Sequence, residues 1–243
     1  MDGTESRPLD RGTHRPRGQP KYGVENHASP RIYLAGTSSQ ASHSGHHRRA
    51  SRLQKKLGET VADLQRAYPK ETIELWTQDE ARLGLKPVLR RQWAPRGERP
   101  IATSRPDYEW LWLYAAVHPA SGHVFWLVLP SLNAALMQRF LEEFAHTHAT
   151  ADKRIVMVMD GATAHRATTV SVPERITVVR LPPYTPELNP TERLWTMVRE
   201  GVANRDFSTL DELEQSVCTR CQNISAMPEQ VMALTNYHWL PTS

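Results

Sequence analysis

Several features of membrane and secreted proteins are missing from this chain of 243 residues. No apolar run approaches the length that a helix needs to cross a bilayer. The first 20 residues lack the apolar stretch of a signal peptide. The two cysteines, Cys218 and Cys221, are too few for a disulfide framework. We therefore expect a soluble cytoplasmic protein with no membrane partner and one sizeable core.

Charge is distributed unevenly along the chain. Residues 1–58 hold 11 Lys and Arg against 4 Asp and Glu, whereas residues 59–243 hold 19 against 22. Within this acidic remainder, residues 82–105 carry 7 basic side chains and one acidic side chain. A positive field of this kind attracts polyanions, of which nucleic acid is the commonest. Charge alone is equally compatible with a solvated loop that has no partner.

Three segments differ in their content of large aliphatic side chains. Residues 1–50 contain few of them, which predicts a disordered basic N-terminal tail, because little apolar surface is available to offset the entropy of ordering. Residues 51–70 are predicted to form a linker helix, since Leu53, Leu57 and Val61 recur at helical spacing. Residues 71–243 are predicted to form one domain that ends in helices.

The pattern of this domain predicts an α/β fold. Strand signals and helix signals alternate, and two of the strands are short and wholly apolar, as in strands buried on both faces. We expect a central sheet with helices on both faces and a short helix between the last two strands. The predicted strands are 71–78, 109–118, 123–130, 154–160 and 175–181, and the main predicted helices are 131–148, 190–202 and 209–224.

Three acidic residues lie at the ends of these predicted elements. Asp79 ends the first strand, Asp160 ends the strand RIVMVMD, and Glu192 lies in the first turn of a helix. Each has an ordinary structural explanation: the aspartates suit turns, and Glu192 fits a capping box with Asn189 as N-cap and Pro190 at the first helical position. Taken singly, these structural explanations are the favoured ones.

Taken together, the three acids predict a metal site. Strand ends of an open α/β sheet meet at one edge, and carboxylates gathered there need a cation to remain ionised together. Two Mg²⁺ ions about 4 Å apart suit such oxygen ligands and support phosphodiester chemistry. The four prolines of LPPYTPELNPTERLW, residues 181–195, restrict the loop that would place Glu192 opposite the aspartates.

The segments ELWTQDEARLGL, VMVMDGATAHR and LPPYTPELNPTERLW closely resemble the three acidic motifs of D-D-E transposases. The similarity is to the mariner-like superfamily, in its bacterial insertion-sequence (IS six-thirty) branch with a DDE superfamily endonuclease domain, and it covers about residues 55–240. The resemblance implies an RNase H-like fold with a mixed central sheet. It also implies metal-dependent DNA cleavage at inverted-repeat ends and transfer of the freed 3′-hydroxyl into target DNA.

The resemblance also implies particular roles for residues. Asp79, Asp160 and Glu192 would be the catalytic acids that bind two Mg²⁺ or Mn²⁺ ions. Double-stranded DNA, from the element ends and the target, would be the partner of a homodimer associated with the nucleoid. DNA contacts would come from Arg82, Lys86, Arg90, Arg91, Arg96, Arg99 and His165, and structural support from Tyr184, Asn189 and Pro190.

One departure from the family pattern leaves alternatives open. Family members usually carry helix-turn-helix modules before the catalytic domain, and residues 1–50 do not have such a pattern. The chain could therefore be the catalytic half of a split gene, or an inactive or truncated remnant that only binds DNA or dimerises. Another RNase H-like nuclease, acting on hybrids or junctions, is the third alternative.

Overall fold

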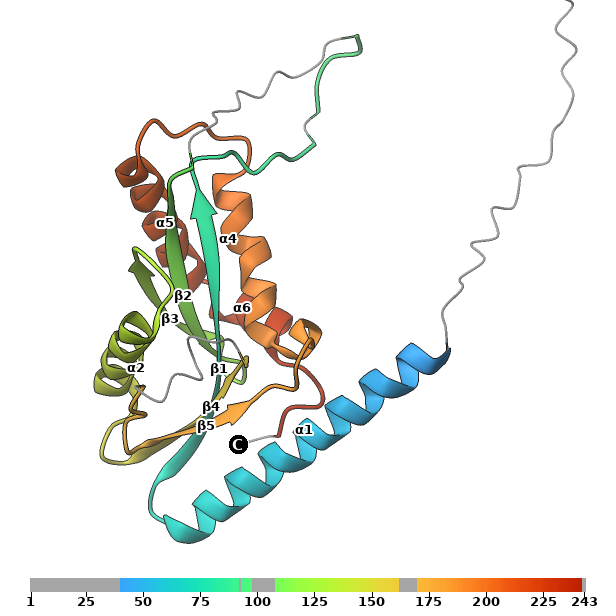
Figure 1. The fold of residues 1–243 in the computed structure, drawn as a ribbon, viewed down its shortest axis with the longest axis vertical. Helices are drawn as coiled ribbons and strands as arrows, with labels where there is room; N and C mark the ends of the chain where they lie inside the picture. The colour runs from blue at the N-terminus through green and yellow to red at the C-terminus, as the bar shows by residue number, and fades with distance from the viewer. Residues whose placement is uncertain (1–39, 92, 98–107, 162–169, 242–243) are drawn as a thin grey trace, which may run out of the picture. The chain divides into compact units, whose positions relative to one another are not determined.

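The central sheet consists of five strands, which lie in the order β3-β2-β1-β4-β5 (Figure 1). β1 pairs antiparallel with β2, which pairs antiparallel with β3, whereas β1, β4 and β5 run parallel. The strands are β1 (Thr72–Gly84), β2 (Trp110–His118), β3 (His123–Leu129), β4 (Lys153–Met159) and β5 (Ile176–Arg180). This mixed sheet, with helices on both faces, confirms the predicted α/β class and the RNase H-like arrangement.

The structure is a computed structural model that describes residues 40–91, 93–97, 108–161 and 170–241, with only the backbone described for 40–47. The seven helical segments within these ranges are α1 (Gln40–Ala67), α2 (Ala134–His148), η1 (Pro186–Leu188), η2 (Pro190–Arg193), α4 (Leu194–Val202), α5 (Leu210–Ser225) and α6 (Pro228–Thr235). No helix in these ranges is long and apolar enough to span a membrane. The short helix predicted between β4 and β5 falls largely on residues 162–169, outside the described residues.

Alternation along the strands separates two packing faces. On one face, Trp76, Tyr114 and Met157 pack with the apolar side of α2. On the opposite face, Leu113 and the buried residues around it pack against α4, α5 and α6. The buried residues of β1, β4 and β5 on that face, such as Leu75 and Val156, pack against α1. Figure 1 shows α2 and α4 on opposite sides of β1. The described residues from Gln40 onward belong to one compact unit.

The predicted hairpin of β2 and β3 is confirmed. Its strands pair from Trp112 opposite Leu129 to His118 opposite His123. The turn requires a glycine, because Gly122 has a φ of +73° and a Cβ there would lie 1.9 Å from the carbonyl oxygen of Pro228. The hairpin turn therefore touches the start of α6, a short helix that the sequence pattern did not reveal.

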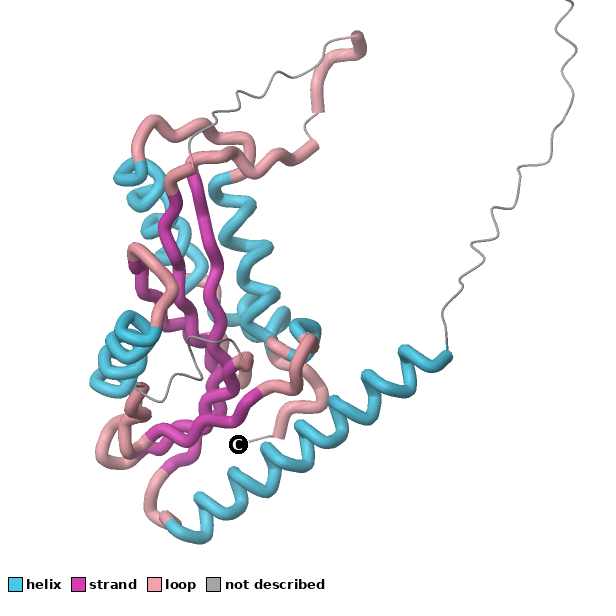
Figure 2. The backbone as a smooth tube through the Cα atoms, in the orientation of Figure 1, coloured by secondary structure: helices cyan, strands magenta, loops and turns pink. Residues whose placement is uncertain are grey.

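Two predicted boundaries differ from the structure. α1 begins at Gln40, so residues 40–50 are helical rather than disordered. The first strand does not end at Asp79: it continues to Gly84, because Ala81 and Leu83 keep the apolar alternation and pair with β2. Figure 2 shows the paired ends of β1 and β2 reaching beyond β4 and β5. Asp79 therefore lies inside a strand.

Candidate active site

The site forms where β1 extends beyond the end of β4, its parallel neighbour. β4 pairs with β1 only as far as Val158 opposite Thr77, and it ends at Met159. Asp79 and Asp160 each lie two residues beyond that last pair, so the two aspartates are level with each other across the sheet. The prediction that strand ends gather the acids is thus right for Asp160, while Asp79 arrives there from the interior of a longer strand.

Hydrogen bonds join the proline-rich loop to β1, through two side chains that come shortly before Glu192. Asn189 donates from Nδ2 to the carbonyl oxygen of Gln78 at 3.0 Å, and its Oδ1 accepts from the amide of Thr191 at 3.2 Å. The Thr191 hydroxyl lies 2.8 Å from the carbonyl oxygen of Thr77 and 2.7 Å from the Thr77 hydroxyl. Asn189 caps a 3₁₀ turn rather than an α-helix.

These contacts hold Glu192 opposite the aspartates. Asn189 and Thr191 are buried, as is Pro190, which begins the 3₁₀ turn. Burial leaves their polar groups dependent on the bonds to β1, so the loop has little freedom to move away from the strand. Glu192 follows on the exposed side of the turn, where its carboxylate is accessible to solvent.

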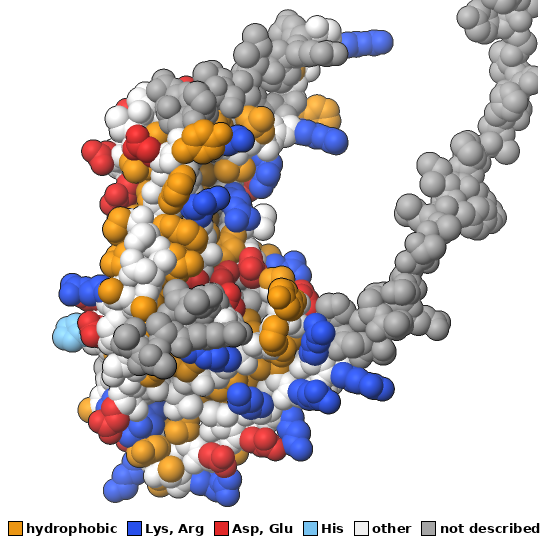
Figure 3. Space-filling view, in the orientation of Figure 1, with side chains coloured by type: hydrophobic (Ala, Val, Ile, Leu, Met, Phe, Trp, Pro, Cys, Tyr) orange, Lys and Arg blue, Asp and Glu red, His pale blue; other side chains and the backbone are white. Residues whose placement is uncertain are grey.

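Asp79, Asp160 and Glu192 line one cavity of about 510 Å³. Gly161 and the loop from Leu181 to Pro186 complete its wall. Figure 3 shows acidic side chains beside the N-terminal end of α4, bordered by hydrophobic side chains. The structure therefore brings together the three acids that the sequence singled out, and their role as metal ligands stays a prediction.

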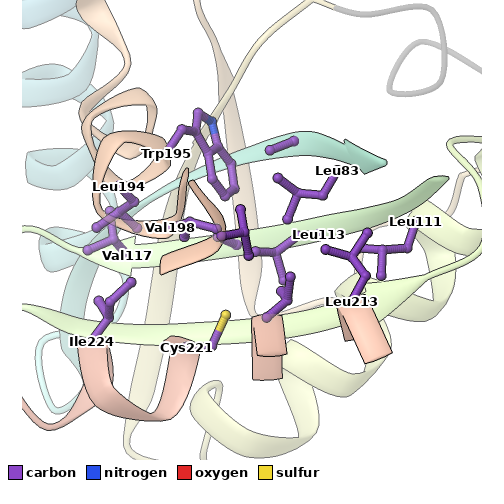
Figure 4. Close-up of a cluster of buried hydrophobic side chains, with 14 of the residues drawn as sticks. Leu83, Leu111, Leu113, Val117, Leu194, Trp195, Val198, Leu213, Cys221 and Ile224 are labelled. Atoms are coloured by element: carbon purple, nitrogen blue, oxygen red, sulfur yellow. The ribbon is translucent and has the colours of Figure 1, made fainter. Parts of the chain in front are cut away.

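Trp195 fixes the orientation of Asp79. Its indole Nε1 donates to Oδ2 of Asp79 at 2.6 Å, while its ring is buried among the apolar side chains under α4 and α5. Figure 4 shows the indole at one end of this cluster, with its nitrogen directed away from the other labelled side chains. A rigid, buried donor of this kind holds one carboxylate oxygen of Asp79 in place, in a residue that lines the cavity.

The electrostatics of the cavity disfavour three ionised carboxylates without a cation. Burial raises the pKa of Asp79 to about 8, and the charge of Glu192 adds to the rise, against the lowering effect of the Trp195 hydrogen bond. The pKa of Glu192 is raised by desolvation and by the charge of Asp160, while Arg199 opposes the rise. The three acids are thus coupled through Glu192.

The residues present fit a hard divalent cation in donor type and in charge. All three donors are carboxylates, which Mg²⁺ and Mn²⁺ prefer, and their mutual repulsion would be relieved by a bound cation. In the described part of the chain, no three His, Cys, Asp or Glu side chains already converge as a chelating cluster. The three carboxylates line one cavity without forming such a cluster, so metal binding by them stays a prediction.

The basic stretch lies partly within the described residues. Arg82, Lys86, Arg91 and Arg96 are exposed, as a DNA contact requires, whereas Arg90 pairs with Glu200 at 2.9 Å. Arg82 also lies 5.0 Å from the ring centroid of Trp110. The other two residues that the sequence predicts to contact DNA, Arg99 and His165, lie outside the described residues.

The structure corrects one supporting role and adds others. Tyr184 was expected to support the fold, but its side chain is 93% exposed at the mouth of the cavity, so it packs against little. Trp195 and Thr191 supply the support instead. Trp195 ends the motif LPPYTPELNPTERLW, three residues after Glu192, and this position is the sequence signal that could have found it.

Two known proteins are similar to this chain in sequence. An uncharacterized protein of Sinorhizobium fredii, y4pE/y4sA, is 30% identical over 131 residues, which are 54% of this chain and 96% of that protein. The insertion element IS630 uncharacterized 39 kDa protein of Shigella sonnei is 24% identical over 177 residues, or 70% of this chain. The chain spans only about half, 51%, of the length of the Shigella protein.

Solved structures of the Mos1 transposase match part of the chain. The Mos1 mariner paired-end complex with Mn matches 79% of this chain and 63% of its own at a TM-score of 0.48 and 17% identity. The Mos1 paired-end complex with the left transposon end matches 76% of this chain and 62% of its own at a TM-score of 0.45 and 17% identity.

The family match spans the site itself. Residues 74–214 match the family described as DDE superfamily endonuclease, a range that includes Asp79, Asp160 and Glu192. This match confirms the relationship that the three motifs predicted, and the similarity to the IS630 protein agrees with the predicted branch. The chain belongs to the DDE superfamily of endonucleases.

Proposed function

We propose that this chain is the catalytic domain of a transposase that cuts DNA at the inverted-repeat ends of an element and joins the freed 3′-hydroxyl to target DNA. The observation that carries the proposal is the convergence of Asp79, Asp160 and Glu192 on one cavity. Membership of the DDE endonuclease superfamily supports it. A homodimeric state and a nucleoid-associated location would follow from this activity, and both stay predictions.

Some residues of the chain would bind the cations, and others would keep those binding residues in position. Asp79 and Asp160 would bind the cations from adjacent strands, and Glu192 would complete the second binding position from the fastened loop. When bound, two Mg²⁺ or Mn²⁺ ions would neutralise charge on the attacking and leaving oxygens of an in-line displacement. Trp195 would keep Asp79 in place, and the loop bonds of Asn189 and Thr191 would keep Glu192 in place.

Two displacements would follow in the same cavity. In the first, water attacks the phosphorus, the bond to the 3′-oxygen breaks, and a 3′-hydroxyl end is released. In the second, that 3′-hydroxyl attacks a phosphodiester of the target and displaces its 3′-oxygen, so one bond is made for each one broken. The exposed basic residues Arg82, Lys86, Arg91 and Arg96 would contact the DNA backbone without reading its sequence.

The proposal is tested by Mg²⁺-dependent nicking of duplexes that carry the inverted repeats flanking the gene. Wild type is compared with Asp160→Asn, Glu192→Gln and the control Glu214→Gln, which changes an exposed acid on α5. We expect nicking by wild type and the control, and a loss of at least about 100-fold in the two site variants, because each removes a charge-stabilising ligand. Equal nicking by all four proteins would show that these acids are not the site.

The same assay separates the alternatives. Salt-dependent DNA binding without any nicking by wild type would favour a non-enzymatic, DNA-binding or dimerising role. Faster cleavage of RNA–DNA hybrids or four-way junctions than of duplex DNA would instead favour another RNase H-like nuclease.

A further inference from the structure

Tyr184 combines two features that its loop does not require. Its side chain is 93% exposed, yet it lines the same cavity as Asp79, Asp160 and Glu192. An exposed aromatic side chain is unremarkable by itself, since folded proteins expose many apolar atoms. The informative point is its location, at the mouth of the cavity where the reacting phosphate would enter.

The backbone at Tyr184 is held in an unfavourable conformation. Its φ is +58°, in the left-handed region that residues with a Cβ adopt at an energetic cost. Such strain persists where the surroundings enforce it, and it is concentrated at functional sites. Here the next residue, Thr185, is buried and donates from Oγ1 to the carbonyl oxygen of Pro182 at 2.7 Å, while Pro183 and Pro186 flank the turn.

The turn therefore presents the ring to solvent on a rigid support. Because the backbone of this turn is held in place, only the ring's own rotation is lost when a partner stacks on it, so the ring is well suited to binding. The cavity beside it carries three carboxylates, which exclude a bare anion and admit a phosphate only together with a cation. A ligand that fits both surfaces has a phosphodiester for the cavity and a flat face for the ring.

We propose that Tyr184 is a stacking platform for the nucleobase next to the reacting phosphate, and that this base is unpaired when it binds. The inference rests on the proposed function, and it adds a subsite to it. Stacking on an aromatic side chain is tolerant of base identity, because every base has a π-face. Tyr184 would thus position the strand without choosing a sequence, and a base that is paired and stacked inside a duplex could not offer its face to the ring.

The test uses a DNA duplex with a short single-stranded 3′ extension that contains 2-aminopurine at the junction. Binding is followed with Ca²⁺ in place of Mg²⁺, so that the DNA stays intact, and stacking is read as quenching of the 2-aminopurine fluorescence. We expect quenching by wild type and Tyr184→Phe. We expect Tyr184→Ala and Tyr184→Gly to lose the quenching and to bind about tenfold more weakly.

The glycine variant separates the ring from the turn. Glycine adopts a positive φ without strain, so Tyr184→Gly keeps the turn and loses only the ring. The inference would be overturned if Tyr184→Gly quenched the fluorescence as strongly as wild type does. It would also be overturned if wild type caused no quenching, whichever junction position carried the 2-aminopurine. A change of oligomeric state in Tyr184→Ala, measured by sedimentation, would overturn it in favour of a contact between two copies of the chain.

The inference and the proposed function fail in different ways. If Asp160→Asn nicks DNA as fast as wild type, the proposed function fails whatever Tyr184 does. If nicking depends on Asp160 while the Tyr184 variants quench and bind like wild type, only the stacking subsite is wrong.

Discussion

Replacing Asp79 with asparagine tests whether the cavity disfavours an ionised carboxylate at this position. The pKa of Asp79 is raised from an ordinary value of 3.8 to about 8, first by burial and then by Glu192. Near neutral pH the carboxyl therefore binds a proton on folding, whereas the unfolded chain leaves it ionised. Stability that is present below about pH 4 is then lost progressively as the pH rises to about 8.

The variant Asp79→Asn is nearly isosteric, and its side-chain oxygen still accepts from Trp195, so packing changes little. Each unit of pKa difference corresponds to about 1.4 kcal/mol. Between pH 5 and pH 8 the wild type should therefore lose at most about 4 kcal/mol of unfolding free energy that the variant keeps.

The assay is urea unfolding of both proteins with a chelator present, at intervals from pH 5 to pH 8. The free-energy difference between variant and wild type should grow with pH in favour of the variant, because the groups outside the cavity titrate alike in the two proteins. Added Mg²⁺ should then stabilise the wild type more than the variant. A difference that is independent of pH would refute the claim that Asp79 is held in a charge-disfavouring site.

Three further outcomes follow from the contacts. Trp195→Phe should destabilise the chain by about 1–3 kcal/mol in urea unfolding, and more at pH 9 than at pH 5, because the lost hydrogen bond favours ionised Asp79. Thr191→Val should cost about 1–3 kcal/mol in the same assay, and an unchanged midpoint would contradict the fastened loop. Replacing both Arg91 and Arg96 with alanine should lower the salt slope of DNA binding by about 2, measured by fluorescence anisotropy, unless these exposed side chains contact no phosphate.

The elements with strong local patterns could be predicted from the sequence. The β2–β3 hairpin has aromatic and β-branched strands around a short turn, and β4 carries an apolar run from Ile155 to Met159, so both were recognised. The end of β1 was misplaced because Gln78, Asp79 and Glu80 are polar and resemble a strand terminus. Pairing with β2 then carries the strand on to Gly84, past these polar residues, with Ala81 and Leu83 buried on one face.

The candidate site was predicted as a set of residues rather than as a geometry. The three acids were found because a carboxylate at each element end has a chemical meaning. The contacts that place them join residues more than 100 positions apart, as with Thr77 and Thr191 or Asp79 and Trp195, and no local pattern encodes such pairs. The exposure of Tyr184 was missed for the same reason, since the sequence shows a tyrosine between prolines but not its direction.

The claim that the three acids form one divalent-cation site is tested most directly by a crystal structure of the chain soaked in Mn²⁺. Anomalous scattering would locate the manganese ions without any assumption about which residues bind them. The account predicts manganese peaks in the cavity, about 2.0–2.3 Å from carboxylate oxygens of Asp79, Asp160 and Glu192. Manganese bound only elsewhere, or an empty cavity at saturating Mn²⁺ with the three carboxylates held apart, would contradict it.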